Sequence, residues 1–224
     1  MNNLQSLSFF YPELLLTGLI IIAIIYDLFL DNSRSDRVGW LLVFGLFIIM
    51  VILFSQDDKK ITTLFSDAIV LDPFSTFFKI IIVFSTILVS IVSLYSDDLK
   101  NYRKGEYFTL LGIVVFGLLL MVSAIDLIMI YLSIEIVSIM SFVLAGYLKQ
   151  NKKSNEAALK YVVYGAFSSG IMLYGLSILF GLTGSTNFFE MQKAISLLGA
   201  DSNLALVLSI VFILVGFGYK ISAV

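Results

Sequence analysis

The fold is indicated by one apolar stretch, Leu127-Ile-Met-Ile-Tyr-Leu-Ser-Ile-Glu-Ile-Val-Ser-Ile-Met-Ser-Phe-Val-Leu-Ala-Gly-Tyr147. As a helix it would be about 30 Å long, which is the thickness of the hydrocarbon core of a bilayer. Its carboxylate, Glu135, lies about 13 Å from the start, close to the midplane. An ionisable group at that depth costs several kcal/mol unless it is neutralised, paired or hydrated. Glu135 therefore predicts an ion or proton path, and the alternative is a permanently neutral acid with a structural hydrogen bond.

The composition predicts an integral membrane protein. Hydrophobic residues make up 59% of the chain, charged residues 13%, and the mean hydropathy is +1.02, whereas soluble domains are about 25% charged. Apolar stretches of about 20 residues recur without the alternation of a barrel strand. We therefore predict an all-α, polytopic transmembrane helix bundle with spans at about 11–30, 38–54, 73–95, 107–125, 127–148, 157–181 and 204–224.

The termini and loops predict how the chain lies in the membrane. The first span is too long for a signal-peptide core, so we expect it to be retained. The last stops at Val224 without a polar flank, so we expect a fragment that ends within a helix. Alternate loops differ in Lys and Arg content, which predicts an N-terminus outside. The richer set is Arg34, Arg37, Lys100, Arg103, Lys104, Lys149, Lys152 and Lys153, and the poorer set is Lys59, Lys60 and Lys193.

The composition argues against redox chemistry on this chain. The chain has no cysteine and no histidine, whereas iron–sulfur clusters need cysteine thiolates and the common haem sites need His, Cys or Met ligands. The Gly216-Phe-Gly218 pair lies inside an apolar span and follows no strand, so it is no dinucleotide-binding fingerprint. If the chain belongs to a redox enzyme, the electrons travel elsewhere.

Two lysines in apolar spans are candidate partners of the buried acid. Lys220 lies about 16 residues into the last span, beside Gly216 and Gly218, which favour a local break. Because broken helices at membrane depth line cavities, we favour a functional role for Lys220. Lys160 lies roughly 9 Å into its span. A relay role and simple extension of its side chain to the interface are equally open for Lys160.

Other polar positions predict local structure. Asp72 and Asp126 should cap the helices that follow them. The segment Thr62–Leu71 should form a turn or hairpin outside the membrane, and 188–198 a short interfacial helix. We expect Lys79, just inside its span, to extend outward to the interface.

The chain resembles subunit N of proton-pumping NADH-quinone oxidoreductase, respiratory complex I, which belongs to a family of antiporter-like membrane subunits. The resemblance covers nearly the whole chain and rests on an ordered set of segments. They include Pro12-Glu-Leu-Leu-Leu16, Asp72-Pro-Phe-Ser-Thr-Phe-Phe-Lys79, Gly105-Glu-Tyr-Phe-Thr-Leu-Leu111, Ser123-Ala-Ile-Asp-Leu127, Tyr131-Leu-Ser-Ile-Glu135, Asn155-Glu-Ala-Ala-Leu-Lys-Tyr161, Gly165-Ala-Phe-Ser-Ser169 and Val215-Gly-Phe-Gly-Tyr-Lys220.

The resemblance implies a bundle of about fourteen helices built from two inverted five-helix repeats, a recurring transporter design. Residues 1–106 would be an N-terminal three-helix region. Residues 107–224 would be part of the first repeat, helices 4 to 7, ending within a helix. Glu135 would be the acid of the central pair, Lys220 its basic partner and Lys160 a further relay lysine.

The resemblance also implies that the chemistry is divided among subunits. NADH, FMN, iron–sulfur clusters and quinone would lie on partner subunits, with no cofactor on this chain. The partners would be the other membrane subunits of complex I and the lipid bilayer, without nucleic acid. We favour a bacterial cytoplasmic membrane over an organellar inner membrane. The alternatives are a subunit of a sodium/proton antiporter or of a membrane-bound hydrogenase, and a structural scaffold whose buried charges only pair.

Overall fold

The computed structural model describes residues 3–31, 35–56, 61–100, 102–199 and 202–222. Within these residues, seven helices are long and apolar enough to cross a membrane, which confirms the predicted helix bundle. They are α2 (Tyr11–Leu28), α3 (Asp36–Ser55), α4 (Pro73–Leu94), α5 (Lys104–Ser123), α6 (Leu127–Ala145), α7 (Lys152–Thr183) and α9 (Asn203–Lys220). The largest difference from the predicted bounds is at α7, which begins five residues early because Asn151 caps it and the polar residues that follow are helical.

Short elements lie before and between the long helices. They are α1 (Asn3–Leu7), β1 (Thr62–Leu64), β2 (Ile69–Leu71), the 3₁₀ turn η2 (Asp97–Leu99) and α8 (Phe188–Ser196). The two strands pair antiparallel, with Thr62 opposite Leu71, so the predicted hairpin is confirmed. Leu64 and Ile69 of the hairpin are buried with Leu120 of α5, which fixes the hairpin against that helix. The predicted interfacial helix corresponds to α8.

Both predicted caps are present. The Asp72 carboxylate accepts a hydrogen bond from the backbone N–H of Ser75 at 2.8 Å. The Asp126 carboxylate accepts from the N–H groups of Ile128 and Met129, at 2.9 and 3.2 Å. Each cap satisfies amides that have no partner within their own helix, and it therefore fixes where α4 and α6 begin.

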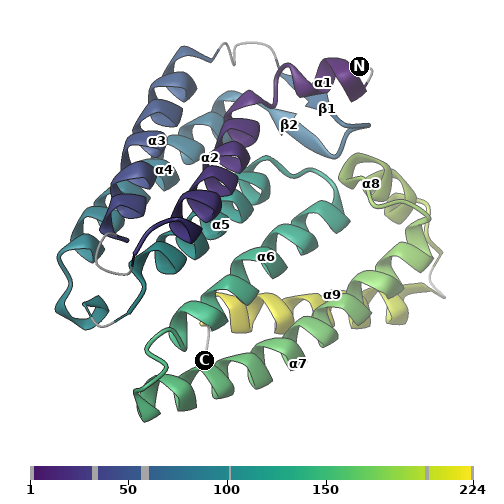
Figure 1. Ribbon diagram of the computed structural model, residues 1–224. Helices are drawn as coiled ribbons and strands as arrows, with labels where there is room; N and C mark the ends of the chain where they lie inside the picture. Colours follow the sequence, from purple (N-terminus) through teal and green to yellow (C-terminus); the bar gives the residue numbers. More distant parts are fainter. Residues whose placement is uncertain (1–2, 32–34, 57–60, 101, 200–201, 223–224) are drawn as a thin grey trace.

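The long helices pack as two groups (Figure 1). Helices α2 to α5 share one apolar core, which includes Leu16, Leu46 and Phe108. Helices α6, α7 and α9 share a second core around Met172 and Leu176. Contacts between α5 and α6 join the two groups. The candidate site lies in the second group.

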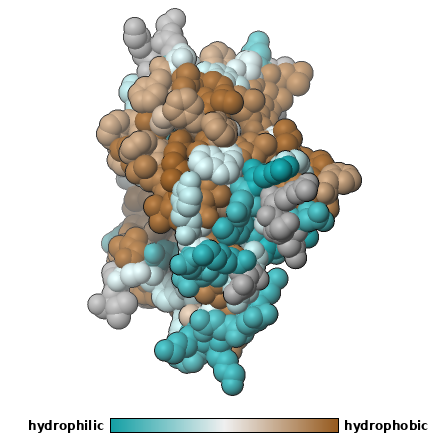
Figure 2. All heavy atoms as spheres, turned by 60° about the vertical axis from the view of Figure 1, so that its left-hand side comes forward, coloured by the Kyte–Doolittle hydropathy of each residue, from teal (hydrophilic) through white to brown (hydrophobic). Residues whose placement is uncertain are grey.

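Large hydrophobic side chains also cover much of the outer surface. Figure 2 shows a face on which hydrophobic side chains cover the upper part and hydrophilic side chains gather toward the bottom. Exposed large apolar residues occur along the long helices other than α5, for example Ile22, Phe47, Phe84, Leu132, Phe167 and Val211. In water such a surface would be an aggregation liability, whereas in a bilayer it faces lipid.

Two local expectations are wrong. Lys79 does not extend to the interface, because its ammonium is buried and lies 2.5 Å from the Glu13 carboxylate on α2. Helix α9 does not break at Gly216 or Gly218 but runs through both to Lys220. Gly216 instead allows a close helix contact, since a side chain there would overlap Met172. Three of the basic residues behind the predicted orientation, Arg34, Lys59 and Lys60, lie outside the described residues.

Candidate functional site

The structure brings together two of the three predicted site residues. The Nζ atom of Lys220 on α9 lies 3.3 Å from Oε1 of Glu135 on α6, although the two residues are 85 positions apart. Glu135 is about 12 Å from the start of α6, in the middle of that helix. The side chains of Lys220 and Glu135 are only 13% and 20% exposed. The site is therefore an acid–base pair inside a group of membrane-spanning helices.

Close packing of α9 on α7 brings the Lys220 side chain beside Glu135. Helix α9 crosses α7, and its C-terminal end comes near α6 (Figure 1). A Cβ atom at Gly175 of α7 would lie 2.8 Å from the Cβ atom of Phe212 on α9. At a second contact between the two helices, the Ser168 hydroxyl donates to the Gly216 carbonyl at 3.3 Å. Glycine at both contacts lets the backbones approach, as in other membrane helix pairs.

Two further residues of α6 complete the surroundings of the lysine. The Lys220 ammonium donates a hydrogen bond to the Ser138 hydroxyl at 2.6 Å. It also lies 5.9 Å from the centre of the Phe142 ring, within range of a cation–π interaction. The i, i+3 spacing places Glu135 and Ser138 on one helix face, but a contact of Ser138 with Lys220 could not be read from the sequence.

Lys160, the third predicted site residue, is not part of this arrangement. It lies on the exposed surface of α7 and pairs with Glu156, one turn earlier, at 2.6 Å. The two side chains are 65% and 64% exposed. Lys160 therefore contacts neither Glu135 nor Lys220 among the described residues.

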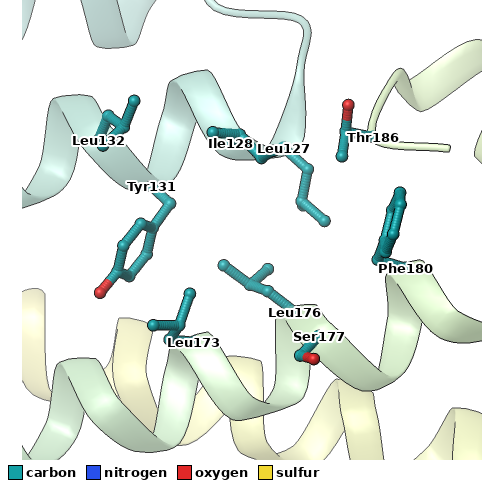
Figure 3. Close-up of a pocket in the computed structure, with 9 residues that line it drawn as sticks. All are labelled: Leu127, Ile128, Tyr131, Leu132, Leu173, Leu176, Ser177, Phe180 and Thr186. Carbon is teal, nitrogen blue, oxygen red and sulfur yellow. The ribbon is translucent and has the colours of Figure 1, made fainter.

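A groove of about 380 Å³ runs between α6 and α7 near the pair (Figure 3). Leu127, Ile128, Tyr131 and Leu132 line it from α6, and Leu173, Leu176, Ser177 and Phe180 line it from α7, with Thr186 at one end. A second cavity, of about 210 Å³, shares Leu127, Tyr131 and Leu176 and extends to Ile213 and Phe217 of α9. Tyr131 lies on both cavities, one helical turn from Glu135, and is thus the polar side chain between the pair and this apolar space.

Sequence reasoning missed a second buried ion pair, Glu13–Lys79, in the other helix group. The side chains of Lys79 and Glu13 are 3% and 2% exposed. Burial of both charges is tolerable because each neutralises the other. The available signal was that each ionisable residue stands inside an apolar span close to its beginning. Their pairing across 66 positions carries no local signal.

A third polar cluster joins the loop before α5 to its neighbours. Arg103 Nε lies 2.9 Å from Asp27 Oδ2 at the end of α2, and the Tyr147 hydroxyl donates to the Arg103 carbonyl. Burial raises the pKa of Tyr147 to about 12, with the Glu106 carboxylate adding to the shift. The phenol therefore remains a hydrogen-bond donor at any physiological pH. This cluster connects α2, α5 and the end of α6.

The described residues include no group of three His, Cys, Asp or Glu side chains placed to hold a metal ion. A carboxylate and an ammonium at hydrogen-bonding distance can exchange charge by gaining or losing protons.

Residues 124–224 match the sequence profile of the NADH:quinone oxidoreductase/Mrp antiporter transmembrane family. Subunit N of NADH-quinone oxidoreductase from Chlorobium chlorochromatii is 38% identical over 98% of this chain and 43% of its own length. Subunit N 2 from Chloroherpeton thalassium is 39% identical over 97% of this chain and 43% of its own length. The chain thus spans less than half the length of these relatives.

Solved structures share the fold. A chain of respiratory complex I from Thermus thermophilus, with bound aureothin, superposes with a TM-score of 0.72 at 20% identity, over 93% of this chain and 43% of that one. A chain of an archaeal membrane-bound sulfane sulfur reductase gives the same TM-score at 17% identity, over 92% and 43%. At these identities the likeness concerns the fold alone. The sequence matches add that residues 124–224 resemble the antiporter-like transmembrane family and that the similarity of the chain to subunit N of NADH-quinone oxidoreductase extends over nearly its whole length.

Proposed function

We propose that the protein is a proton-translocating subunit of NADH-quinone oxidoreductase, and that Glu135 and Lys220 carry the proton. The observation that supports this most directly is the 3.3 Å ion pair inside a group of membrane-spanning helices. Ionisable groups at membrane depth are costly and usually mark ion or proton paths. The relatives that carry the subunit N name supply the class of enzyme.

The proposed step is a change in the strength of this pair. Two opposite charges 3.3 Å apart attract by about 5 kcal/mol at an effective dielectric constant of ~20. If the Glu135 carboxylate is protonated or withdrawn, the Lys220 ammonium loses this stabilisation and releases its proton more readily. If the carboxylate returns, the lysine is driven to take up a proton again. Energy from electron transfer on other subunits would set the direction.

Electron transfer is assigned to partner subunits. NADH, FMN, iron–sulfur clusters and quinone would bind there, since this chain offers neither Cys nor His as a ligand. The other membrane subunits of the complex would be the neighbours of the exposed apolar helix faces, together with lipid. Lys160 would serve as a further relay lysine, in contact with water through its exposed pair with Glu156.

The test uses the full-length subunit assembled in its complex. Glu135→Gln keeps the size and hydrogen-bonding capacity of the side chain but removes the titratable charge, so NADH-driven proton uptake by inverted vesicles should fall severely. Lys220→Ala should do the same, and Lys160→Ala should have an equal or smaller effect. NADH oxidation with an artificial acceptor should stay normal in all three. Unchanged proton-to-electron stoichiometry in Glu135→Gln would remove Glu135 from the path.

The proposed location is a bacterial cytoplasmic membrane, with the N-terminus outside, because Lys and Arg favour the inner loops. A cysteine introduced at Lys152 should then react with an impermeant thiol reagent only from the cytoplasmic side. A cysteine at Lys193 should react only from the outside. The opposite labelling would reverse the proposed orientation.

A sodium/proton antiporter subunit is a second candidate, because the matching family profile includes Mrp antiporters. The same acid–base pair would then exchange sodium for protons without NADH. Sodium-dependent proton movement in vesicles that lack NADH, abolished by Glu135→Gln, would favour this candidate over the first.

A further inference from the structure

The Lys220 ammonium lies closer to a serine than to its acidic partner. Its Nζ atom is 2.6 Å from the Ser138 hydroxyl oxygen and 3.3 Å from Glu135 Oε1. The Ser138 hydroxyl donates its hydrogen to the Ile134 carbonyl at 2.7 Å, which leaves an oxygen lone pair to accept from the lysine. Ser138 is buried, so this hydrogen bond to a charged group is largely protected from water.

An aromatic ring of the same helix also lies near the lysine. Phe142 faces the ammonium at 5.9 Å and packs edge-on against Tyr161 of α7, with ring centres 4.6 Å apart. A side chain at Gly165 of α7 would overlap the Phe142 ring, so the glycine makes the room that the ring occupies. Glu135, Ser138 and Phe142 thus stand at positions i, i+3 and i+7, along one face of α6.

We propose that Ser138 and Phe142 form a lysine seat, a pair of positioning residues that hold the Lys220 side chain beside Glu135 in both of its protonation states. This inference rests on the proposed function. When Glu135 is protonated or turned away, the ammonium keeps the Ser138 oxygen and the Phe142 ring as partners. When Lys220 is a neutral amine, the same hydroxyl can rotate and donate to it, because a hydroxyl both donates and accepts.

The lysine seat has a mechanistic consequence. A long lysine side chain without a fixed partner would spread over many rotamers and would have to find Glu135 anew in each cycle. A seated lysine changes its charge without changing its place. Proton transfer then depends on movement of the carboxylate and not on the arrival of the amine.

Helix α6 supplies a matched control. Ser133 is also buried, and its hydroxyl donates to the Met129 carbonyl at 2.7 Å, the same bond that Ser138 makes to Ile134. In the described part of the chain, Ser133 contacts no lysine. A serine that only satisfies its own helix should therefore behave alike at both positions, whereas a positioning residue should matter only at 138.

The experiment measures NADH-driven proton pumping in the assembled complex. Ser138→Ala should lower the pumping rate about tenfold, which is the scale of one lost hydrogen bond to a charged group, while the KM values for NADH and quinone stay unchanged. Ser133→Ala should pump normally, and Ser138→Thr, which keeps the hydroxyl, should retain most of the rate. In a Lys220→Ala background, Ser138→Ala should cause no further loss, because the residue on which it acts is gone.

Each outcome distinguishes a positioning role of Ser138 from a purely structural one. Normal pumping by Ser138→Ala, or an equal loss in Ser133→Ala, would overturn the lysine seat, and so would an additive loss in the Lys220→Ala background. If Ser138→Ala does not assemble, Phe142→Leu decides instead. This substitution removes the ring but keeps the apolar volume. The pumping rate should fall about threefold because the cation–π contact is lost. An unchanged pumping rate would overturn the lysine seat. Failure of the proposed function has a separate signature, namely normal pumping by Glu135→Gln.

Discussion

The buried Glu13–Lys79 pair predicts a large stability effect that depends on which partner is left alone. The charges are 2.5 Å apart and almost fully buried, so their attraction is about 7 kcal/mol at an effective dielectric constant of ~20. Lys79→Met removes the cation and strands the Glu13 carboxylate in an apolar environment. For pairs of this kind the net cost is about 3–5 kcal/mol. Replacement of both residues by methionine should be nearly neutral, because no charge is then left unpaired.

Thiol labelling can measure this effect in the membrane. The chain has no cysteine, so Leu16→Cys, at a fully buried position one turn after Glu13 on α2, is a specific reporter of helix separation. If labelling requires local opening, a loss of 3–5 kcal/mol should speed it by about 10²- to 5 × 10³-fold. The double methionine variant should label within about tenfold of the parent protein.

An exposed ion pair is the control. Lys193 and Glu190 on α8 lie 3.0 Å apart but are mostly exposed, so Lys193→Met should leave the labelling rate nearly unchanged. If Lys79→Met labelled no faster than Lys193→Met, the claim that the buried pair holds α2 against α4 would be wrong. If the double methionine variant labelled as fast as Lys79→Met, the loss of stability would come from altered packing and not from an unpaired charge.

Three further perturbations follow from the packing. Gly175→Leu should separate α9 from α7 and reduce the pumping rate. Gly170→Leu is the control and should pump normally, because a Cβ atom there meets nothing within 4 Å. Equal rates in the two variants would show that the close contact at Gly175 is not needed for pumping. Gly105→Ala should push against the Asp27 carboxylate and lower stability by about 1–3 kcal/mol in a thermal melt in detergent. Tyr147→Phe should cost about 1 kcal/mol at neutral pH, the worth of its lost hydrogen bond. The folded state raises the pKa of Tyr147 to about 12, above the usual value of ~10. The contribution of the phenol is therefore complete below about pH 10 and is lost as pH rises toward 12. Because two pKa units correspond to about 3 kcal/mol, this loss exceeds the worth of the hydrogen bond, and the parent should melt below the Phe variant at pH 12.

The helices were predictable because hydrocarbon imposes a length and a polarity on every span. Helix starts were also predictable where an aspartate stands directly before an apolar run, as at Asp72 and Asp126. The early start of α7 was not, because its first turns are polar and hydropathy reports only the apolar part of a helix. There the cap at Asn151 was the better signal.

The candidate site was predictable as a set of residues but not as a geometry. Glu135 and Lys220 were found because each ionisable group contradicts its apolar surroundings. The contact of Lys220 with Ser138 depends on how α9 crosses α7, and the crossing is set by packing at Gly175 and Gly216. The prediction for Lys79 was wrong for a similar reason. Its partner lies on another helix, and the sequence of one span shows only that the membrane interface is near.

The length of α7 has a consequence for how a mechanical load outside the membrane reaches the helices inside it. Its 32 residues make a rod of about 48 Å, whereas the hydrocarbon is only ~30 Å thick and typical tilts shorten the projection by little. About three turns must therefore lie outside the hydrocarbon, and the polar first turns, Lys152 to Glu156, identify the protruding end. Because the helix is continuous, a sideways load on the protruding turns reaches the crossing with α9 without a hinge to absorb it.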